Sequence, residues 1–302
     1  MNTDIVEVSN LTKAYGSMTA VNGISFSVQK GEIFGLLGPN GAGKTTTLEC
    51  LEGLRQPDGG KLRILGSDPL KNPKDLRSLI GVQLQSSALP GTMRVGEAMN
   101  IFCAYHQVAP RYDLLERMGL SGKMKAQYQT LSTGQKRRLA LALAVAHQPP
   151  VVILDEPTAG LDVATRAELH RLMAELREEG TTLILSTHDM AEAEEMADRV
   201  AILLQGEIVA GGSPRQLTAA GEGLTKISVY ATDTDFSTLN EPEAVRYTTR
   251  ENYHTYYTTE TGRVVSSIIS HIEHTGGKLI DLRVERPSLE ERFLELTNRE
   301  VS

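Results

Sequence analysis

Apolar and polar positions alternate early in the chain and then give way to nearly uninterrupted apolar runs. Residues 23–28 alternate, which predicts a strand with one buried face. Residues 33–37 and 151–154 are apolar almost throughout, as is typical of parallel strands that are buried on both faces. Strand and helix patterns then follow one another from residue 151 to 210. We therefore predict an α/β fold with a parallel sheet.

Breaks in this pattern predict two domains. Residues 90–148 are expected to form a mainly helical subdomain, and glycines and Pro214 mark the end of the core near residue 215. The first domain is therefore placed at residues 1–215. Residues 226–302 form a second, small α+β domain in this interpretation.

The second domain carries its own local signals. Residues 226–231 alternate like a strand, and residues 244–259 are expected to form a hairpin that turns at residues 250–252. Ser288 and Glu291 form a capping-box pattern at the start of a last helix. An amphipathic helix is expected between the hairpin and this last helix, and it ends at Gly276 and Gly277. Its apolar face is formed by Val264, Val265, Ile268, Ile269 and Ile272.

Composition narrows the function classes. The 302 residues are 40% hydrophobic, which is enough for packed cores, and the net charge of −7 argues against nucleic-acid binding. No apolar run approaches the ~18 residues of a membrane span, and we expect no signal peptide at the acidic N-terminus. Cys50 and Cys103 fit reduced thiols in the cytosol better than a disulfide framework. If the protein acts at a membrane, another chain must supply the membrane part.

A phosphate-binding loop is the strongest chemical signal in the sequence. Residues 38–45 read GPNGAGKT, and they lie between an apolar strand and a helix-like run, which is the context that this motif requires. The glycines let backbone N–H groups turn toward phosphate oxygens. Lys44 is expected to contact the β- and γ-phosphates, and the Thr45 hydroxyl is expected to bind Mg²⁺.

Two acidic residues follow the apolar run at 151–154. Asp155 ends that strand and is expected to hold Mg²⁺. Glu156 comes next and is a candidate general base for an attacking water. Acidic residues also occur after strands as simple turn formers, but the phosphate loop earlier in the chain favours the catalytic interpretation.

The order of three motifs carries a family resemblance. The phosphate loop is followed by Leu-Ser-Thr-Gly-Gln at residues 131–135 and by Leu-Asp-Glu-Pro-Thr at residues 154–158. Ser132 is also a good N-cap for the helix that follows it. Together these segments resemble the ATP-binding subunits of ABC transporters over residues 1–215. The resemblance implies a P-loop NTPase core of the ABC ATPase type, Mg²⁺-dependent ATP hydrolysis, and an ATP site shared between two subunits.

The resemblance assigns further roles. Tyr15 resembles the aromatic residue that stacks on adenine, and His188 resembles the histidine that contacts the γ-phosphate, which makes it a second catalytic candidate beside Glu156. Gln85 resembles the glutamine that touches Mg²⁺, although Gln83 is a competing candidate. Asp162 matches an aspartate that acts across the dimer, and it is also a plausible helix N-cap. The full nucleotide-binding set is Tyr15, Gly38, Pro39, Asn40, Gly41, Ala42, Gly43, Lys44, Thr45, Thr46, Ser132, Gly134 and Gln135, and the metal set is Thr45, Gln85 and Asp155.

One position departs from the family pattern. Members of the family usually have glycine where this chain has Thr133, and a β-branched residue restricts the backbone and adds bulk. Ser132 and Gly134, the expected γ-phosphate donors, are retained. We therefore expect activity with altered turnover.

The last part of the chain points to a branch of the family. Residues 287–297 resemble the C-terminus of exporter ATPases of the daunorubicin-resistance type. We expect an energy-coupling subunit that exports drug, antibiotic or lipid-like substrates, bound to a separate permease at the cytoplasmic face of the membrane and working as a homodimer rather than a heterodimer. The alternatives are an importer ATPase and a soluble ABC ATPase. The soluble class usually carries two cassettes or a coiled-coil insertion, and this chain shows neither.

Overall fold

The chain divides into two compact units, Met1–Pro214 and Arg215–Ser302. The structure is a computed structural model. It describes residues 4–71, 73–85, 89–220, 224–239, 241, 243–250 and 252–300, with the backbone alone at 73, 74 and 298–300. Among these residues, no helix is both long and apolar enough to cross a lipid bilayer.

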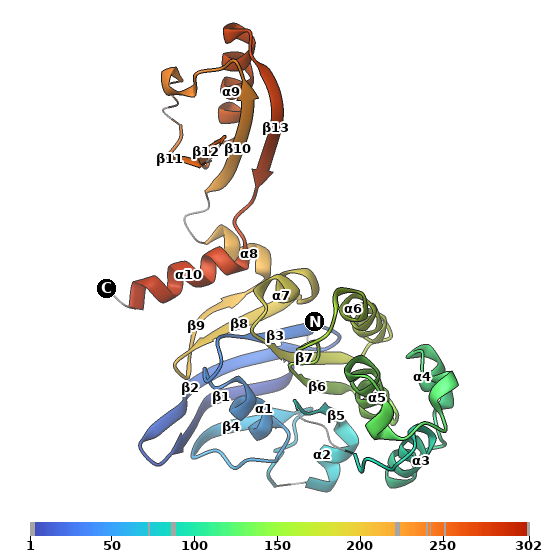
Figure 1. Ribbon diagram of the computed structural model, residues 1–302. Helices are drawn as coiled ribbons and strands as arrows, with labels where there is room; N and C mark the ends of the chain where they lie inside the picture. The colour runs from blue at the N-terminus through green and yellow to red at the C-terminus, as the bar shows by residue number, and fades with distance from the viewer. Residues whose placement is uncertain are drawn as a thin grey trace. The chain divides into compact units, whose positions relative to one another are not determined.

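A six-stranded sheet forms the centre of the first unit (Figure 1). Its strand order is β5-β6-β7-β3-β8-β9, in which β5 to β8 run parallel and β9 pairs antiparallel with β8. Every residue of β3 and β6 is buried, which confirms the strands predicted from the apolar runs. The strands are β3 (Ile33–Leu37), β5 (Ile80–Gln83), β6 (Val151–Asp155), β7 (Thr182–Thr187), β8 (Arg199–Leu204) and β9 (Glu207–Gly212).

A second, antiparallel sheet packs over the first around helix α1 (Lys44–Leu51). Its order is β2-β1-β4, with β1 at Asp4–Tyr15, β2 at Met18–Gln29 and β4 at Gly59–Ile64. One apolar cluster joins both sheets and the helix, and it includes Val8, Leu48 and Ile153. The start of α1, and the phosphate loop before it, are therefore held by two layers of packed side chains.

Helices cover the rest of the first unit. The segment predicted to be helical contains α3, α4 and α5 with two short 3₁₀ turns, and α3 and α4 each contact α5. Gly81 of β5 packs closely on α5, because a Cβ at this position would lie 2.0 Å from the Ala144 carbonyl oxygen. The helices are α2 (Pro73–Leu79), α3 (Val95–Tyr105), α4 (Tyr112–Arg117), α5 (Thr133–Val145), α6 (Val163–Glu178) and α7 (Met190–Met196).

The second unit has its own sheet and its own core. The strand order is β11-β12-β10-β13, and all pairs are antiparallel. The apolar face of α9 packs on this sheet through Val264, Ile268 and Ile272. The elements are α8 (Pro214–Ala219), β10 (Thr225–Thr232), β11 (Arg246–Arg250), β12 (Tyr253–Thr258), α9 (Thr261–Thr275), β13 (Lys278–Glu285) and α10 (Leu289–Glu300).

The structure confirms most of the local signals in this unit and adds one strand. Ser288 and Glu291 form the reciprocal bonds of a capping box, and Gly276 ends α9 with a φ of 73°. The tip of the hairpin, at Glu251, lies outside the described residues. Strand β13 was not predicted from the sequence, because it is largely exposed and lacks a continuous apolar run.

Truncating the core of the second unit is expected to loosen that unit alone. Ile268 is fully buried in a cluster made only of second-unit residues, so Ile268→Ala should cost about 2–5 kcal/mol of that unit's unfolding free energy. Hydrogen–deuterium exchange of the whole chain should become faster in β10 and β12, while exchange in β3 and β6 stays unchanged. Ser270→Ala, an exposed site on the same helix, is the control. Unchanged exchange in β10 would show that this packing is not what stabilises the sheet.

Candidate active site

The phosphate loop follows β3 directly and ends where α1 begins. The backbone at Gly38 and Gly43 has φ values of 151° and 105°. A Cβ would lie 2.3 Å from the Leu203 carbonyl oxygen at Gly38 and 2.4 Å from the Ala20 carbonyl oxygen at Gly43. Only glycine fits these two positions, since both the conformation and the space exclude a side chain. The packing of the loop against β2 and β8 therefore sets its shape.

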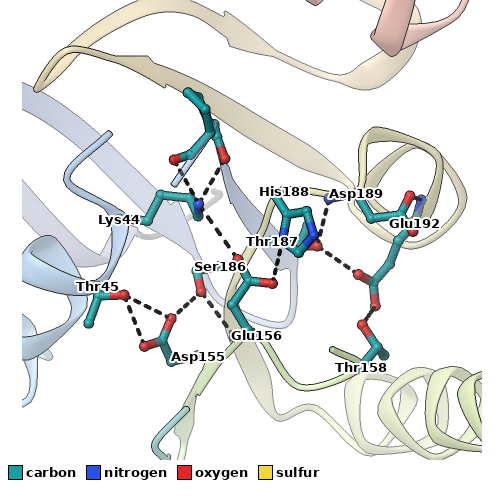
Figure 2. Close-up of polar contacts among 12 residues, drawn as sticks. Lys44, Thr45, Asp155, Glu156, Thr158, Ser186, Thr187, His188, Asp189 and Glu192 are labelled. Carbon is teal, nitrogen blue, oxygen red and sulfur yellow. Dashed lines mark hydrogen bonds and ion pairs between the residues drawn. The ribbon is translucent and has the colours of Figure 1, made fainter. Parts of the chain in front are cut away.

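Lys44 lies beneath this loop and is almost fully buried. Its Nζ donates to the carbonyl oxygens of Gly38 at 2.7 Å and Pro39 at 3.2 Å, and it lies 3.6 Å from Glu156 Oε1 (Figure 2). Burial lowers the pKa of the ammonium, and the attraction of Glu156 opposes this shift. A buried cation with an acidic neighbour at the start of a helix is suited to bind the negative charge of phosphates.

A cavity of about 370 Å³ opens beside the loop. Tyr15, Gln85 and Glu156 line it together with loop residues, so positions far apart in sequence meet around one space. Tyr15 is partly exposed at the cavity and lies under the side chains of Lys13 and Arg55. The lining consists of Tyr15, Met18, Ala20, Asn40, Gly41, Gly43, Lys44, Thr45, Thr46, Gln85 and Glu156.

Gln83 and Gln85, the two candidates for the Mg²⁺-contacting glutamine, lie in different surroundings. Gln83 belongs to β5, pairs in register with Leu154, and is 1% exposed. Gln85 lies beyond the end of the strand and lines the cavity. Of the two, Gln85 is the one whose surroundings fit a ligand contact.

Side-chain oxygens of three residues lie in the cavity or next to a residue that lines it. Thr45 Oγ1 lies 3.1 Å from Asp155 Oδ2, and the Gln85 side chain lines the same space. The Ser186 hydroxyl donates to Asp155 and holds it in place (Figure 2). Mg²⁺ prefers hard oxygen ligands, so the chemistry of this donor set fits the ion.

Glu156 joins three of the loops that follow parallel strands. Its Oε1 lies 3.6 Å from Lys44 Nζ, and its Oε2 is 2.8 Å from His188 Nδ1. The backbone of Glu156 has a φ of 48°, in the left-handed region, and its N–H donates to Ser186 near the end of β7. This conformation turns the carboxylate toward His188 and Lys44, away from the Asp155 side. Ser186 is a site residue that sequence reasoning missed.

The segment at residues 131–135 does not belong to the described lining of the cavity. Ser132 caps α5, and Ser132 and Gln135 exchange side-chain-to-backbone bonds of 3.1 and 3.2 Å. Among the described residues that line the cavity, Ser132, Gly134 and Gln135 do not occur. Thr133 begins α5 with an exposed side chain, so the single chain accommodates its branched Cβ without crowding.

Gly134 has a packing role within the chain. A Cβ at this position would lie 2.6 Å from Thr165 Cγ2. Thr165 cannot easily move, because both its N–H and its hydroxyl donate to Asp162, which caps α6. The starts of α5 and α6 are therefore in direct contact at Gly134.

A third carboxyl group, that of Glu52, is buried near the site. It directly follows α1, is 7% exposed, and neither of its side-chain oxygens has a hydrogen-bond partner within the part of the chain that the structure describes. Burial, with smaller repulsion from Asp155 and Glu49, raises the pKa of Glu52 to about 8. Glu52 is therefore largely protonated at neutral pH.

Comparison with known protein families gives a match over the part of the chain that contains the phosphate loop and Glu156. The family model described as ABC transporter matches residues 21–159. Those residues contain the phosphate loop, the segment at 131–135, Asp155 and Glu156.

Curated relatives match almost the whole chain. The linearmycin resistance ATP-binding protein LnrL of Bacillus subtilis (strain 168) is 35% identical over 98% of this chain and 99% of its own length. The Nod factor export ATP-binding protein I of Ralstonia nicotianae is 36% identical over 99% of this chain and 96% of its own length. The similarity therefore extends through the second unit.

Solved structures match most of the chain. An ATP-binding subunit of an ABC transporter superposes with a TM-score of 0.66 at 27% identity, covering 70% of this chain and 91% of that one. The structure of cbiO1 from Clostridium perfringens, part of the ABC transporter complex cbiONQ, has a TM-score of 0.62 at 29% identity over 74% of this chain and 93% of that one.

The contact at Gly134 predicts a repairable defect. Gly134→Ala should destabilise the chain by about 1–3 kcal/mol through overpacking, despite the better helix propensity of alanine. Thr165→Ser removes the clashing methyl group and keeps the hydroxyl that donates to Asp162. Thermal denaturation of both single variants and the double variant should show a loss of stability in Gly134→Ala that Thr165→Ser recovers. A Gly134→Ala protein as stable as the wild type would contradict the close contact.

Glu52 predicts a pH dependence of stability. Its folded pKa, about 8, lies above the ordinary value of 4.5, so its protonation favours folding fully below pH 4.5, and this contribution is lost as the pH rises toward 8. Glu52→Gln removes the ionisation, and its stability relative to the wild type should therefore grow between pH 5 and 8, by on the order of 1 kcal/mol per pH unit. Urea denaturation at several pH values measures this difference, with the exposed Glu7→Gln as the control. A difference that does not change with pH would place the Glu52 pKa near its ordinary value.

Proposed function

The chain belongs to the ATP-binding subunits of ABC transporters, which hydrolyse ATP, and from that premise we propose that it drives export of drug, antibiotic or lipid-like molecules through a separate permease. The observation that carries the chemistry is the contact of Glu156 with both Lys44 and His188. The names of the relatives, which refer to resistance and to export, support the direction of transport. Their similarity covers the second unit as well as the ATPase core.

We place ATP in the cavity in a single orientation. The adenine ring stacks on Tyr15, which is exposed at the cavity, while the phosphates lie on residues 38–46. Lys44 contacts the β- and γ-phosphates, so its ammonium exchanges part of its contact with Glu156 for phosphate oxygens. The loop thus binds the triphosphate mainly through backbone N–H groups and one buried cation.

Thr45, Asp155 and Gln85 would hold Mg²⁺ on the phosphate side of the cavity. When bound, the ion supplies positive charge that offsets the charge of the phosphate oxygens. Ser186 keeps the Asp155 carboxylate oriented by donating a hydrogen bond to it.

Glu156 and His188 act on the attacking water and the γ-phosphate. The Glu156 carboxylate orients the water and accepts its proton. His188 is 2.8 Å from Glu156, and its side chain is about half exposed, so it is free to reach a γ-phosphate beside the loop. Charge stabilisation and positioning account for most of the catalysis in phosphoryl transfer.

We place the remaining nucleotide contacts in a second copy of the chain. Ser132, Gly134 and Gln135 lie at the start of α5, outside the described lining of the cavity. In a head-to-tail homodimer they reach the γ-phosphate bound to the other subunit. The dimer docks on the permease at the cytoplasmic face of the cell membrane.

Replacing Glu156 tests the function directly. Glu156→Gln keeps the shape of the side chain and removes the base, so hydrolysis should slow by ~10²–10⁴-fold while ATP affinity is retained. Sedimentation of this variant with Mg-ATP should reveal a dimer, because the ligand that joins the two copies persists. Glu178→Gln, an exposed position on α6, serves as the control and should hydrolyse ATP normally. Wild-type turnover in Glu156→Gln would remove this residue from the base role, and a monomer at saturating ATP would exclude the shared site.

A further inference from the structure

A buried carboxylate behind the candidate active site connects three elements. Glu192 lies on α7, and its side chain is 1% exposed. Its Oε1 accepts from Thr158 Oγ1 at 2.6 Å, and its Oε2 accepts from Thr187 Oγ1 at 2.8 Å (Figure 2). The same Oε1 lies 3.0 Å from His170 Nε2. Sequence reasoning assigned no role to Glu192 or Thr187, and it named Thr158 only as part of the segment at residues 154–158.

The partners of Glu192 lie next to the residues that contact the water and the phosphate. Thr158 is two residues after Glu156, in the loop that follows β6. Thr187 ends β7 and directly precedes His188. The same carboxylate therefore holds both loops, and these loops present the Glu156–His188 contact of 2.8 Å.

The helix that carries Glu192 is itself fixed at its start. Asp189 caps α7 by accepting from the Glu192 N–H at 3.0 Å, and Arg166 of α6 donates to the same aspartate at 2.9 Å. The Asp189 N–H donates to Thr187 Oγ1 at 3.0 Å. Short local bonds therefore limit how far Glu192 can move relative to His188.

A purely structural role would not require a charge at this position. Burial of a carboxylate costs free energy unless hydrogen bonds compensate, and an apolar side chain could fill the same volume. Burial raises the pKa of the Glu192 carboxyl, but the hydrogen bonds from His170, Thr158 and Thr187 outweigh it and hold the pKa below its ordinary value. The site thus keeps an ionised acceptor, which can receive hydrogen bonds from several donors with defined directions.

We propose that Glu192 is a positioning residue for ATP hydrolysis, which sets the distance between Glu156 and His188 by holding Thr158 and Thr187 at the same time. This inference rests on the proposed roles of Glu156 and His188. The side-chain bonds of Glu192 within the described ranges go to Thr158, His170 and Thr187, which belong neither to the phosphate loop nor to the lining of the cavity. Glu192 should therefore affect the chemical step and leave nucleotide affinity unchanged.

Glu192→Gln is the first test, since it keeps the volume and removes the charge. Misplacement of a catalytic group can cost up to ~10²-fold in rate, so we expect kcat to fall by about 10–100-fold, with KM for ATP and fluorescent-ATP affinity within about twofold of the wild type. Glu195→Gln is the matched control, because Glu195 is on the same helix, is 73% exposed and lies 3.7 Å from the other nitrogen of His170. The control should keep wild-type kcat.

Threonine variants separate positioning from folding. Thr158→Val and Thr187→Val keep the shape and remove the hydroxyls, and each should lower kcat like Glu192→Gln. Thr158→Ser and Thr187→Ser retain the hydroxyls and should restore kcat. Combining either valine variant with Glu192→Gln should have a smaller effect than the product of the single effects, because both changes weaken the same hydrogen-bonded contact.

The outcomes distinguish this inference from the proposed function. Wild-type kcat in Glu192→Gln, while Glu156→Gln is inactive, would overturn the inference and leave the proposed function intact. A loss of kcat that is matched by an equal loss of ATP affinity and of thermal stability would also overturn it, since that pattern reports general unfolding. Wild-type turnover in Glu156→Gln would instead remove the base role of Glu156, on which this inference rests.

Discussion

The candidate site depends on one carboxylate that is shared between a cation and an imidazole. Lys44 follows β3, Glu156 follows β6 and His188 follows β7, and the three side chains meet because parallel strands end at the same edge of the sheet. Lys44 and Glu156 are both nearly buried, so neither charge is well solvated without the other. The strand order β6-β7-β3 brings these residues together, and so the sheet topology is part of the active site.

The elements that could be predicted from the sequence are those whose signal lies in a few adjacent residues. Strands β3 and β6 could be recognised because they are buried on both faces and therefore continuously apolar. The phosphate loop could be recognised because its glycines, lysine and threonine are adjacent in the chain. Strand β13 could not, since its exposed residues follow no clear pattern.

The contacts between strand ends were beyond sequence reasoning. Ser186 reaches Asp155, and Glu192 reaches Thr158, across more than thirty positions in the chain. The pairing register of β6 and β7 places Asp155 opposite Ser186, and Glu192 lies on the helix that follows β7. The choice between Gln83 and Gln85 depended likewise on where β5 ends, and strand ends are uncertain in sequence patterns. The roles of these residues in catalysis stay predictions that site-directed variants can test.

The backbone at Glu156 links function to stability. A non-glycine residue with a φ of 48° costs free energy, of order 1 kcal/mol or more, which asparagine or glycine would largely avoid. Either replacement would also remove the carboxylate that lies 3.6 Å from the buried Lys44 ammonium, and breaking a buried ion pair is itself costly. The strained turn is therefore maintained at this position by the same charge that the site uses.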